Sequence, residues 1–254
     1  MTTRSAAFGV SALAALVAAT GTVSAQSVNR DLIDSLYVQL LYVALPLTLF
    51  VLVILVYCVV RFRDNDDPRP TTEDPSLEIT WTAATAVILL FVGVSSYAVF
   101  ASPYLSTGIT ADEIGGTGPT PVDVPEDDEV VEVLAYQWEW QFSYDEANVT
   151  TRNELVVPAD EDVSLVMTSG DVIHTLAVPD LGLRQDVFPG EETTVRTNVH
   201  ETGEYDLQCT EFCGAQHSHM LANVTVVDRE TYDEWLAEHE DESDVTDPPP
   251  VTDA

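Results

Sequence analysis

The sequence predicts a membrane-anchored all-β protein in which a two-helix transmembrane hairpin precedes a Greek-key β-sandwich. Two almost wholly apolar runs lie within the first 100 positions. Each is long enough to cross a hydrocarbon core of ~30 Å, which takes ~20 helical residues. From Glu129 to Val227, short β-prone runs alternate with turn residues. Several short strands at this spacing are typical of a sandwich or a barrel.

Residues 1–25 have the features of a cleavable signal peptide. Arg4 supplies a positively charged start, and the apolar run from Ala6 to Ala19 is too short to span a bilayer. Val23-Ser24-Ala25 resembles a signal-peptide cleavage site. We therefore expect the mature chain to begin at Gln26, with an uncleaved additional helix as the alternative.

The transmembrane hairpin is expected over residues 26–100. Its first span runs from about Val38 to Val60 and is interrupted by Pro46, and its second runs from about Ile79 to Phe100. The connection between the spans carries three of the nine basic residues, namely Arg61, Arg63 and Arg69. Positively charged short loops stay in the cytoplasm. We therefore expect a multi-pass protein of the plasma membrane, with two spans and its soluble domain on the extracellular side.

The charge balance is extreme. Asp and Glu number 43 against 9 Lys and Arg, which gives a formal net charge of −34. This excludes a nucleic-acid partner, because such partners require basic patches. A hydrophobic content of 46% argues against general disorder. Since the acids are spread along the whole soluble part, we interpret them as an adaptation to high salt and expect a halophilic source; a specialised acidic patch is the alternative.

The soluble part is expected to comprise a linker, a sandwich with a closing helix, and a tail. Residues 101–128 are rich in Gly, Pro, Thr and Asp, as linkers are. The sandwich domain then occupies residues 129–239 and ends in a helix capped by Asp228. Residues 240–254 are acidic and Pro-rich and are predicted to be disordered. The β-prone runs are Val130–Leu134, Trp138–Tyr144, Leu155–Val157, Val163–Thr168, Thr193–Thr197 and Leu221–Val227.

A twelve-residue segment near the end of the sandwich carries the chemistry. It reads Cys209-Thr-Glu-Phe-Cys213-Gly-Ala-Gln-His217-Ser-His-Met220. Thiolate, imidazole and thioether together are the ligands of a copper electron-transfer site, whereas zinc rarely takes a thioether. His174 is well placed to supply a second imidazole. The alternative is a disulfide between the two cysteines. The ligand spacing selects His217 rather than the nearby His219, and His200 and His239 are expected to be surface histidines.

This motif resembles the binuclear copper A motif of subunit II of haem-copper terminal oxidases, the cytochrome c oxidase family, whose soluble domain has the cupredoxin fold. The resemblance covers roughly residues 30–239. It implies that Cys209 and Cys213 bridge two copper ions and that His174 and His217 supply one nitrogen each. It further implies that Met220 is a weak axial ligand and that Glu211 provides its backbone carbonyl. The Glu211 side chain would also help to bind magnesium at the contact with subunit I.

Two further residues receive roles from the same resemblance. The run Ala135-Tyr-Gln-Trp-Glu-Trp-Gln-Phe142 is similar to the family's aromatic stretch, in which the first Trp receives the donor's electron, and Trp138 takes that position. Strand alternation by itself places Trp138 and Trp140 on one face, as in core packing. Glu78 resembles the family's Glu at the cytoplasmic start of the second span, which feeds a proton-uptake path. Solvation at the membrane surface is the alternative for Glu78.

The resemblance implies an electron-input subunit of a proton-pumping oxidase. Its partners would be subunit I and the other oxidase subunits, membrane lipid, and a soluble donor that is either cytochrome c or a small blue-copper protein. Reduction of oxygen to water would take place in subunit I. Two alternatives remain open at this point: a copper A subunit of a membrane nitric oxide reductase, and a membrane-tethered copper carrier.

Overall fold

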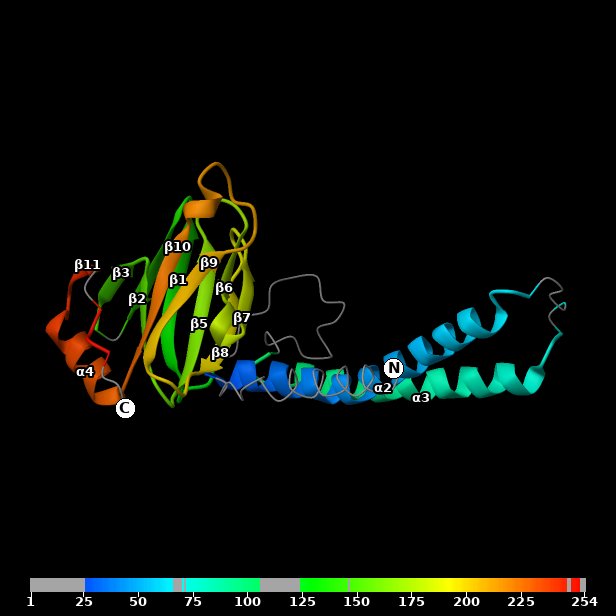
Figure 1. Ribbon diagram of the computed structural model, residues 1–254. Helices are drawn as coiled ribbons and strands as arrows, with labels where there is room; N and C mark the ends of the chain where they lie inside the picture. The colour runs from blue at the N-terminus through cyan, green and yellow to red at the C-terminus, as the bar shows by residue number, and fades with distance from the viewer. Residues whose placement is uncertain are drawn as a thin grey trace, which may run out of the picture.

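The computed structural model describes residues 26–65, 70, 72–105, 124–145, 147–245 and 248–251. The expected signal peptide (1–25), Arg69, and residues 106–123 of the expected linker lie outside the described residues. A long helical hairpin extends from one end of a β-sandwich (Figure 1). The predicted fold class, two apolar helices followed by a β-sandwich, is confirmed.

The hairpin consists of α2 (Val28–Phe62) and α3 (Pro75–Phe100). Both are long and apolar enough to cross a membrane, and their apolar side chains are exposed. Asp74 caps α3 by accepting the N–H groups of Ser76 and Leu77. Pro46 lies inside α2, which diverges from α3 in its second half (Figure 1). Proline removes a backbone donor and bends a helix, which accounts for the divergence.

The sandwich has two sheets (Figure 1). The first contains, in spatial order, β11 (Ser243–Val245), β3 (Val149–Arg152), β2 (Glu139–Tyr144), β1 (Glu129–Tyr136), β5 (Asp162–Ser169) and β8 (Thr193–Asn198). The second contains β4 (Glu154–Pro158), β10 (Leu221–Val227), β9 (Gly203–Cys209), β6 (His174–Val178) and β7 (Leu183–Val187). Three parallel pairs, β1 with β5, β10 with β4 and β11 with β3, break the otherwise antiparallel pairing.

Strand alternation builds the core between the sheets. In β2, Trp140, Phe142 and Tyr144 are buried while the residues between them are only half-buried. At one edge, helix α4 (Arg229–Glu238) closes the core, with Asp228 accepting the N–H of Thr231 as its cap. The Trp235 ring lies edge-on to Tyr144, with centroids 5.3 Å apart. The core therefore reaches from the strands to this closing helix.

The tail prediction requires a correction. Residues 240–254 were expected to be disordered, but Ser243–Val245 forms strand β11 beside β3. Its position is stabilised by a side chain from the neighbouring strand, since an Arg152 Nη2 lies 2.7 Å from Asp244 Oδ1. The side chain of Val245 is buried, so the strand also contributes to the core. Acidic composition alone therefore gave the wrong prediction for these three residues.

The start of α2 is fixed to the sandwich. Ser27 Oγ donates to the Leu181 carbonyl at 2.6 Å, and Asn29 Nδ2 donates to the carbonyls of Tyr104 and Arg196 at 2.8 and 2.9 Å. Tyr104, just beyond α3, donates its hydroxyl proton to Asp162 at 2.7 Å. The two ends of the hairpin therefore meet at the same place on the sandwich.

Beneath this joint lies an ion pair between the half-buried Arg196 and the buried Asp128. Arg196 contacts Asp128 through two nitrogens, at 2.6 and 2.7 Å, which is the bidentate geometry that favours arginine. Burial raises the pKa of Asp128, but the hydrogen bonds from Arg196 and Ser164 outweigh it and hold that pKa below its usual value. The carboxylate therefore stays charged and keeps β8 tied to the start of β1.

Candidate metal centre

Three strand ends bring the predicted ligands together at one end of the sandwich. His174 is the first residue of β6 and Cys209 the last residue of β9, and the two strands are antiparallel neighbours. The segment from 210 to 220 then leads from β9 into β10 and contains a short 3-10 turn, η2 (His217–His219). This loop lies at the end of the sandwich opposite the hairpin (Figure 1).

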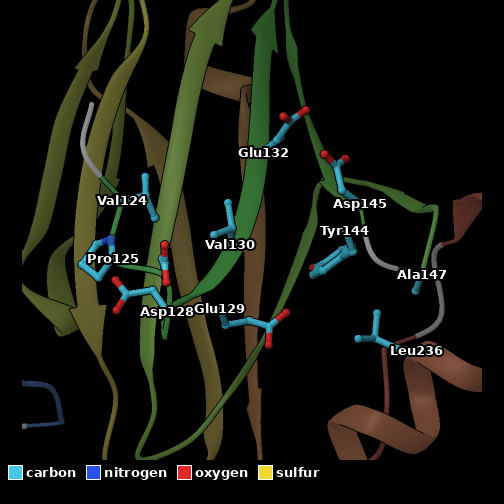
Figure 2. Close-up of a pocket in the computed structure, with 11 residues that line it drawn as sticks. Val124, Pro125, Asp128, Glu129, Val130, Glu132, Tyr144, Asp145, Ala147 and Leu236 are labelled. Carbon is cyan, nitrogen blue, oxygen red and sulfur yellow. The ribbon is translucent and has the colours of Figure 1, made fainter. Parts of the chain in front are cut away.

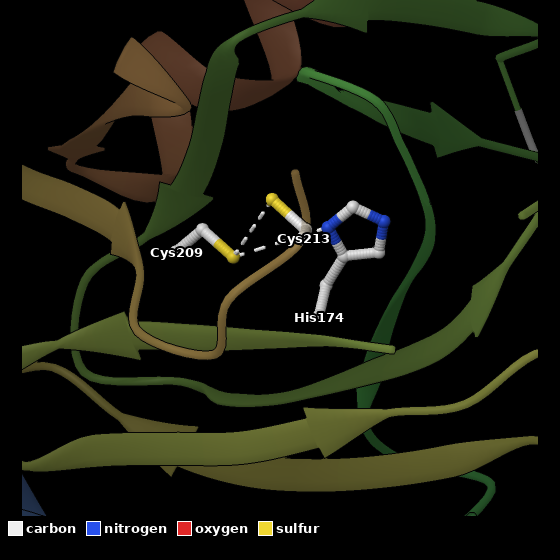
Figure 3. Close-up of side chains that lie close together, drawn as sticks. All are labelled: His174, Cys209 and Cys213. Carbon is white, nitrogen blue, oxygen red and sulfur yellow. Dashed lines mark hydrogen bonds between the residues drawn. The ribbon is translucent and has the colours of Figure 1, made fainter. Parts of the chain in front are cut away.

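His174 and the two cysteines form the centre of the site (Figure 3). Cys209 Sγ lies 3.9 Å from His174 Nδ1 and 3.9 Å from Cys213 Sγ. All three residues are buried, and their candidate ligand atoms lie within 4.8 Å of one another. Both cysteines are free thiols, so the disulfide considered from the sequence is absent from this structure.

The loop adds the remaining donors. Cys213 Sγ lies 3.5 Å from His217 Nδ1 and 3.6 Å from Met220 Sδ. The Glu211 carbonyl accepts a hydrogen bond from the Cys209 thiol at 3.3 Å, while the Glu211 side chain is exposed. We call these six groups the ligand cluster: His174, Cys209, the Glu211 carbonyl, Cys213, His217 and Met220. All six predicted ligands therefore occupy one small volume.

The two thiols differ sharply in acidity. Burial raises the pKa of Cys209, but hydrogen bonds from His174 and the Thr175 backbone outweigh it and lower that pKa to about 7. Burial and the negative charge of Cys209 raise the pKa of Cys213 to about 12. At neutral pH the pair therefore carries at most one negative charge, because two thiolates at this distance repel each other. A bound cation would remove this penalty, so the arrangement favours a thiophilic metal ion.

Asp171 orients His174 and was not singled out from the sequence. His174 Nε2 lies 2.9 Å from Asp171 Oδ1; since a carboxylate only accepts, Nε2 carries the proton and Nδ1 faces Cys209. Burial raises the pKa of Asp171, but hydrogen bonds from His174 and from the backbone N–H groups of Gln137 and Val172 lower it overall. Carboxylates commonly fix the tautomer of metal-binding histidines in this way. The spacing Asp171-x-x-His174 was the sequence signal that could have identified Asp171 as the partner of His174.

Trp138 lies elsewhere than the strand alternation predicted. It occupies the turn between β1 and β2 and is half-buried, whereas Trp140 is fully buried. The turn arises because Tyr136 pairs directly with Glu139, leaving Gln137 and Trp138 as the connection. A methyl group on Gly214 would lie 3.3 Å from Trp138 Nε1, so the indole packs against the residue that follows Cys213.

Trp140 contacts the cluster from inside the core. Its ring lies edge-on to His174, with centroids 6.0 Å apart. Burial is complete at both residues. Trp140 therefore helps to hold the imidazole in place, which agrees with the expected role of this side chain in packing.

The other residues considered from the sequence lie away from the ligand cluster. Glu78 is exposed in the first turn of α3, on the membrane hairpin. The exposed His219 ring contacts the Ser218 hydroxyl, the His200 ring contacts Asp160, and the His239 ring contacts the Trp235 carbonyl. None of these three histidines contacts a cluster sulfur in the part of the chain that the structure describes.

A cavity of about 320 Å³ lies between β1, the end of β2 and α4 (Figure 2). Its wall includes Glu129, Glu132 and Asp145, and it contains neither thiol nor imidazole. Burial and the nearby Asp145 and Glu192 carboxylates raise the pKa of Glu132. The cavity therefore gathers carboxylates but offers no thiol, imidazole or thioether ligand for a soft metal, unlike the ligand cluster.

The fold and the site define a class of protein. A β-sandwich that holds two thiols, two imidazoles and a thioether at one end, and that follows an apolar hairpin, is a membrane-anchored cupredoxin-like domain. Such folds hold a soft-metal site in the loops at one end of a rigid scaffold.

Comparison with known proteins gives the family. The cytochrome C oxidase subunit II periplasmic domain family matches residues 145–227, and the corresponding transmembrane domain family matches residues 16–99. Cytochrome c oxidase subunit 2 of Synechocystis sp. is 32% identical over 246 residues, covering 84% of this chain and 74% of the relative. A probable cytochrome c oxidase subunit 2 of Rickettsia bellii is 29% identical over 221 residues, covering 78% of this chain and 76% of the relative.

Among solved structures, the periplasmic domain of cytochrome oxidase subunit II of Bradyrhizobium japonicum is 27% identical, with a TM-score of 0.43, and covers 46% of this chain and 96% of that one. The two matching domain families together extend over most of the chain. The chain belongs to the cytochrome c oxidase subunit II family. It is subunit II of a cytochrome c oxidase, an oxidoreductase complex, and it is anchored in the membrane with a periplasmic domain.

Proposed function

We propose that the ligand cluster holds binuclear copper A and that this chain receives electrons for the oxidase. Cys209 and Cys213 would bridge the two copper ions, and His174 and His217 would each supply Nδ1. Met220 and the Glu211 carbonyl would complete the two coordination spheres. When bound, copper A supplies a one-electron relay between a soluble donor and the haem of subunit I. The observation that carries the proposal is the convergence of two imidazoles, a thioether and a backbone carbonyl on two thiols 3.9 Å apart.

The surrounding residues support a site that changes little during electron transfer. Asp171 fixes the His174 ring, and Trp140 packs against its edge. Burial of both thiols and of Met220 excludes water from the sulfur atoms. A rigid, dry site suits electron transfer, because few groups must rearrange when the charge changes.

Trp138 is proposed to receive the electron from the donor. It is half-buried at the surface of the metal-bearing end and lies against Gly214, next to Cys213. A direct packing contact therefore leads from a partly exposed indole to the residue that follows the ligand Cys213. The donor would be cytochrome c or a small blue-copper protein.

Three further roles extend the proposal to the complex. Oxygen would be reduced to water in subunit I, with coupled proton pumping. The exposed Glu211 side chain would help to bind magnesium at the contact with that subunit. Glu78, at the start of α3, would contribute to a proton-uptake path on the cytoplasmic side of a two-span hairpin.

The metal assignment is tested by thiol replacement in the full chain purified in detergent. Wild type should bind two copper ions and show a mixed-valence electron paramagnetic resonance spectrum. Cys209→Ser or Cys213→Ser should abolish that spectrum, whereas the control His219→Ala should retain it. A mixed-valence spectrum that survives replacement of both cysteines would refute the assignment. Oxygen consumption by the complex, compared with nitric oxide consumption, decides between an oxidase and a nitric oxide reductase.

We also infer adaptation to high salt. The support is the formal net charge of −34 together with the spread of exposed carboxylates. Arg229 illustrates the shortage of cations, because its Nη1 contacts Glu129 and Glu161 while its Nε contacts Asp233. At high ionic strength the remaining repulsion is screened over a few Å. A halophilic source follows from this inference.

A further inference from the structure

Gln137 contacts both segments that carry the ligand cluster. It lies in the turn between β1 and β2, where its backbone N–H donates to Asp171 Oδ2 at 2.8 Å. Its side-chain Nε2 donates to the carbonyl of Cys213 at 2.6 Å. One exposed residue therefore joins the segment before β6 to the loop between β9 and β10.

The first contact acts on the histidine. Asp171 accepts from Gln137 through one carboxylate oxygen and from His174 Nε2 through the other. The backbone of Gln137 thus fixes the carboxylate that fixes the imidazole. Because the contact uses the main chain, a change of the Gln137 side chain leaves it in place.

The second contact acts on the cysteine. The side-chain amide holds the carbonyl of the residue that contributes one bridging thiol, which restrains the backbone from which Cys213 Sγ projects. Gly214 shows how close this approach is: its φ is +126°, and a methyl group there would lie 2.7 Å from Gln137 Nε2. A side chain at position 214 would therefore separate the loop from the turn.

From these contacts we propose that Gln137 is a positioning residue, whose side-chain amide sets the placement of Cys213 relative to His174 and thereby the geometry of the metal pair. The proposal rests on the proposed function, since it assumes that copper binds the ligand cluster. Gln137 contacts no sulfur itself; its effect passes through the Cys213 backbone. Residues that support metal ligands in this way typically change metal affinity 10–100-fold when replaced.

The test uses the full chain in detergent, loaded with copper. Gln137→Met keeps the length of the side chain but removes the donor, and Gln137→Glu replaces the donor by an acceptor. The matched control is Gln185→Met, which removes a comparable bond from a glutamine amide to a backbone carbonyl, at 3.2 Å from Asp186 O. Copper affinity is measured by competition with a chelator, the spectrum by electron paramagnetic resonance, and folding of the metal-free chain by circular dichroism.

Both Gln137 variants should fold like wild type without metal, bind copper ~10–100-fold more weakly, and show altered copper hyperfine splitting, while Gln185→Met matches wild type. Wild-type affinity and splitting in both Gln137 variants would overturn the proposal. So would equal weakening by Gln185→Met, which would mark a general loss of stability. If wild type itself fails to bind a copper pair, the proposed function fails, and that outcome is separate because it requires no variant.

Discussion

Replacing Trp138 separates electron receipt from copper binding, because the structure places this indole in a half-buried turn and Trp140 in the core. Complete removal of a buried Trp costs ~3–5 kcal/mol. Trp140 is 0% exposed, so Trp140→Ala should cost this full amount and disturb His174. Trp138 is only partly buried, so Trp138→Ala should reduce the free energy of unfolding by about half as much, ~2 kcal/mol.

Trp138→Ala should leave the copper site intact but slow electron transfer from the native donor. A Trp at the centre of a docking surface commonly contributes at least ~2 kcal/mol, which corresponds to ~30-fold in affinity or in the second-order rate constant. Stopped-flow reduction of the assembled oxidase by its native donor should therefore slow ~30-fold. A small artificial reductant requires no docking surface and should reduce the copper of the variant at the wild-type rate.

Two results would refute this reasoning. Equal slowing with both reductants, together with loss of the copper spectrum, would show that Trp138 is needed for the site itself. Unchanged reduction by the native donor would show that the electron is received elsewhere. Trp140→Ala is the control, since it should impair copper binding and both reductions together.

Three further outcomes are expected. Copper binding should weaken as pH falls, because Cys213 has a raised pKa and is protonated in the metal-free chain, so that copper must displace its proton. Copper affinity measured by chelator competition between pH 6 and 8 checks this, and an affinity that does not change with pH would contradict it. Mass spectrometry of the membrane-bound chain should find Gln26 at the amino terminus, and recovery of Met1 or Thr2 would require an additional span. In ~10 mM salt, where screening reaches ~30 Å, the sandwich should lose structure and copper; unchanged circular dichroism after dialysis would argue against salt adaptation.

The ligand cluster was predictable because most of it lies within one loop. Twelve consecutive residues contain Cys209, Cys213, His217 and Met220. The chemistry of these ligands identifies the class of metal without knowledge of the fold. His174 comes from another strand; it was predicted because a copper site with these ligands usually takes one more imidazole from an earlier strand, and the family resemblance gave the same residue. The apolar runs were equally clear, because the length required to cross a membrane is fixed.

The Asp171-x-x-His174 spacing was a local signal, but the contacts that Gln137 makes with Asp171 and with the loop were beyond prediction from the sequence. Asp171 and Gln137 lie far from the loop along the chain, and only the pairing of β6 with β9 and the turn after β1 bring them to it. Trp138 was assigned to a strand because alternating aromatic residues extend through it, but a two-residue turn interrupts that alternation. Strand β9 had a usable signal, since Tyr205, Leu207 and Cys209 alternate with polar residues.

The joint between α2 and the sandwich determines how the sandwich is oriented relative to neighbouring membrane proteins. Ser27 and Asn29 bind the sandwich from the same helix that continues toward the membrane, and Tyr104 binds it from the end of α3. A rotation of the hairpin within the bilayer is thereby transmitted to the loop at the far end of the domain. The lateral packing of the two helices among neighbouring membrane proteins therefore sets the orientation of the metal-bearing loop about the membrane normal. This orientation is set before any contact forms outside the membrane.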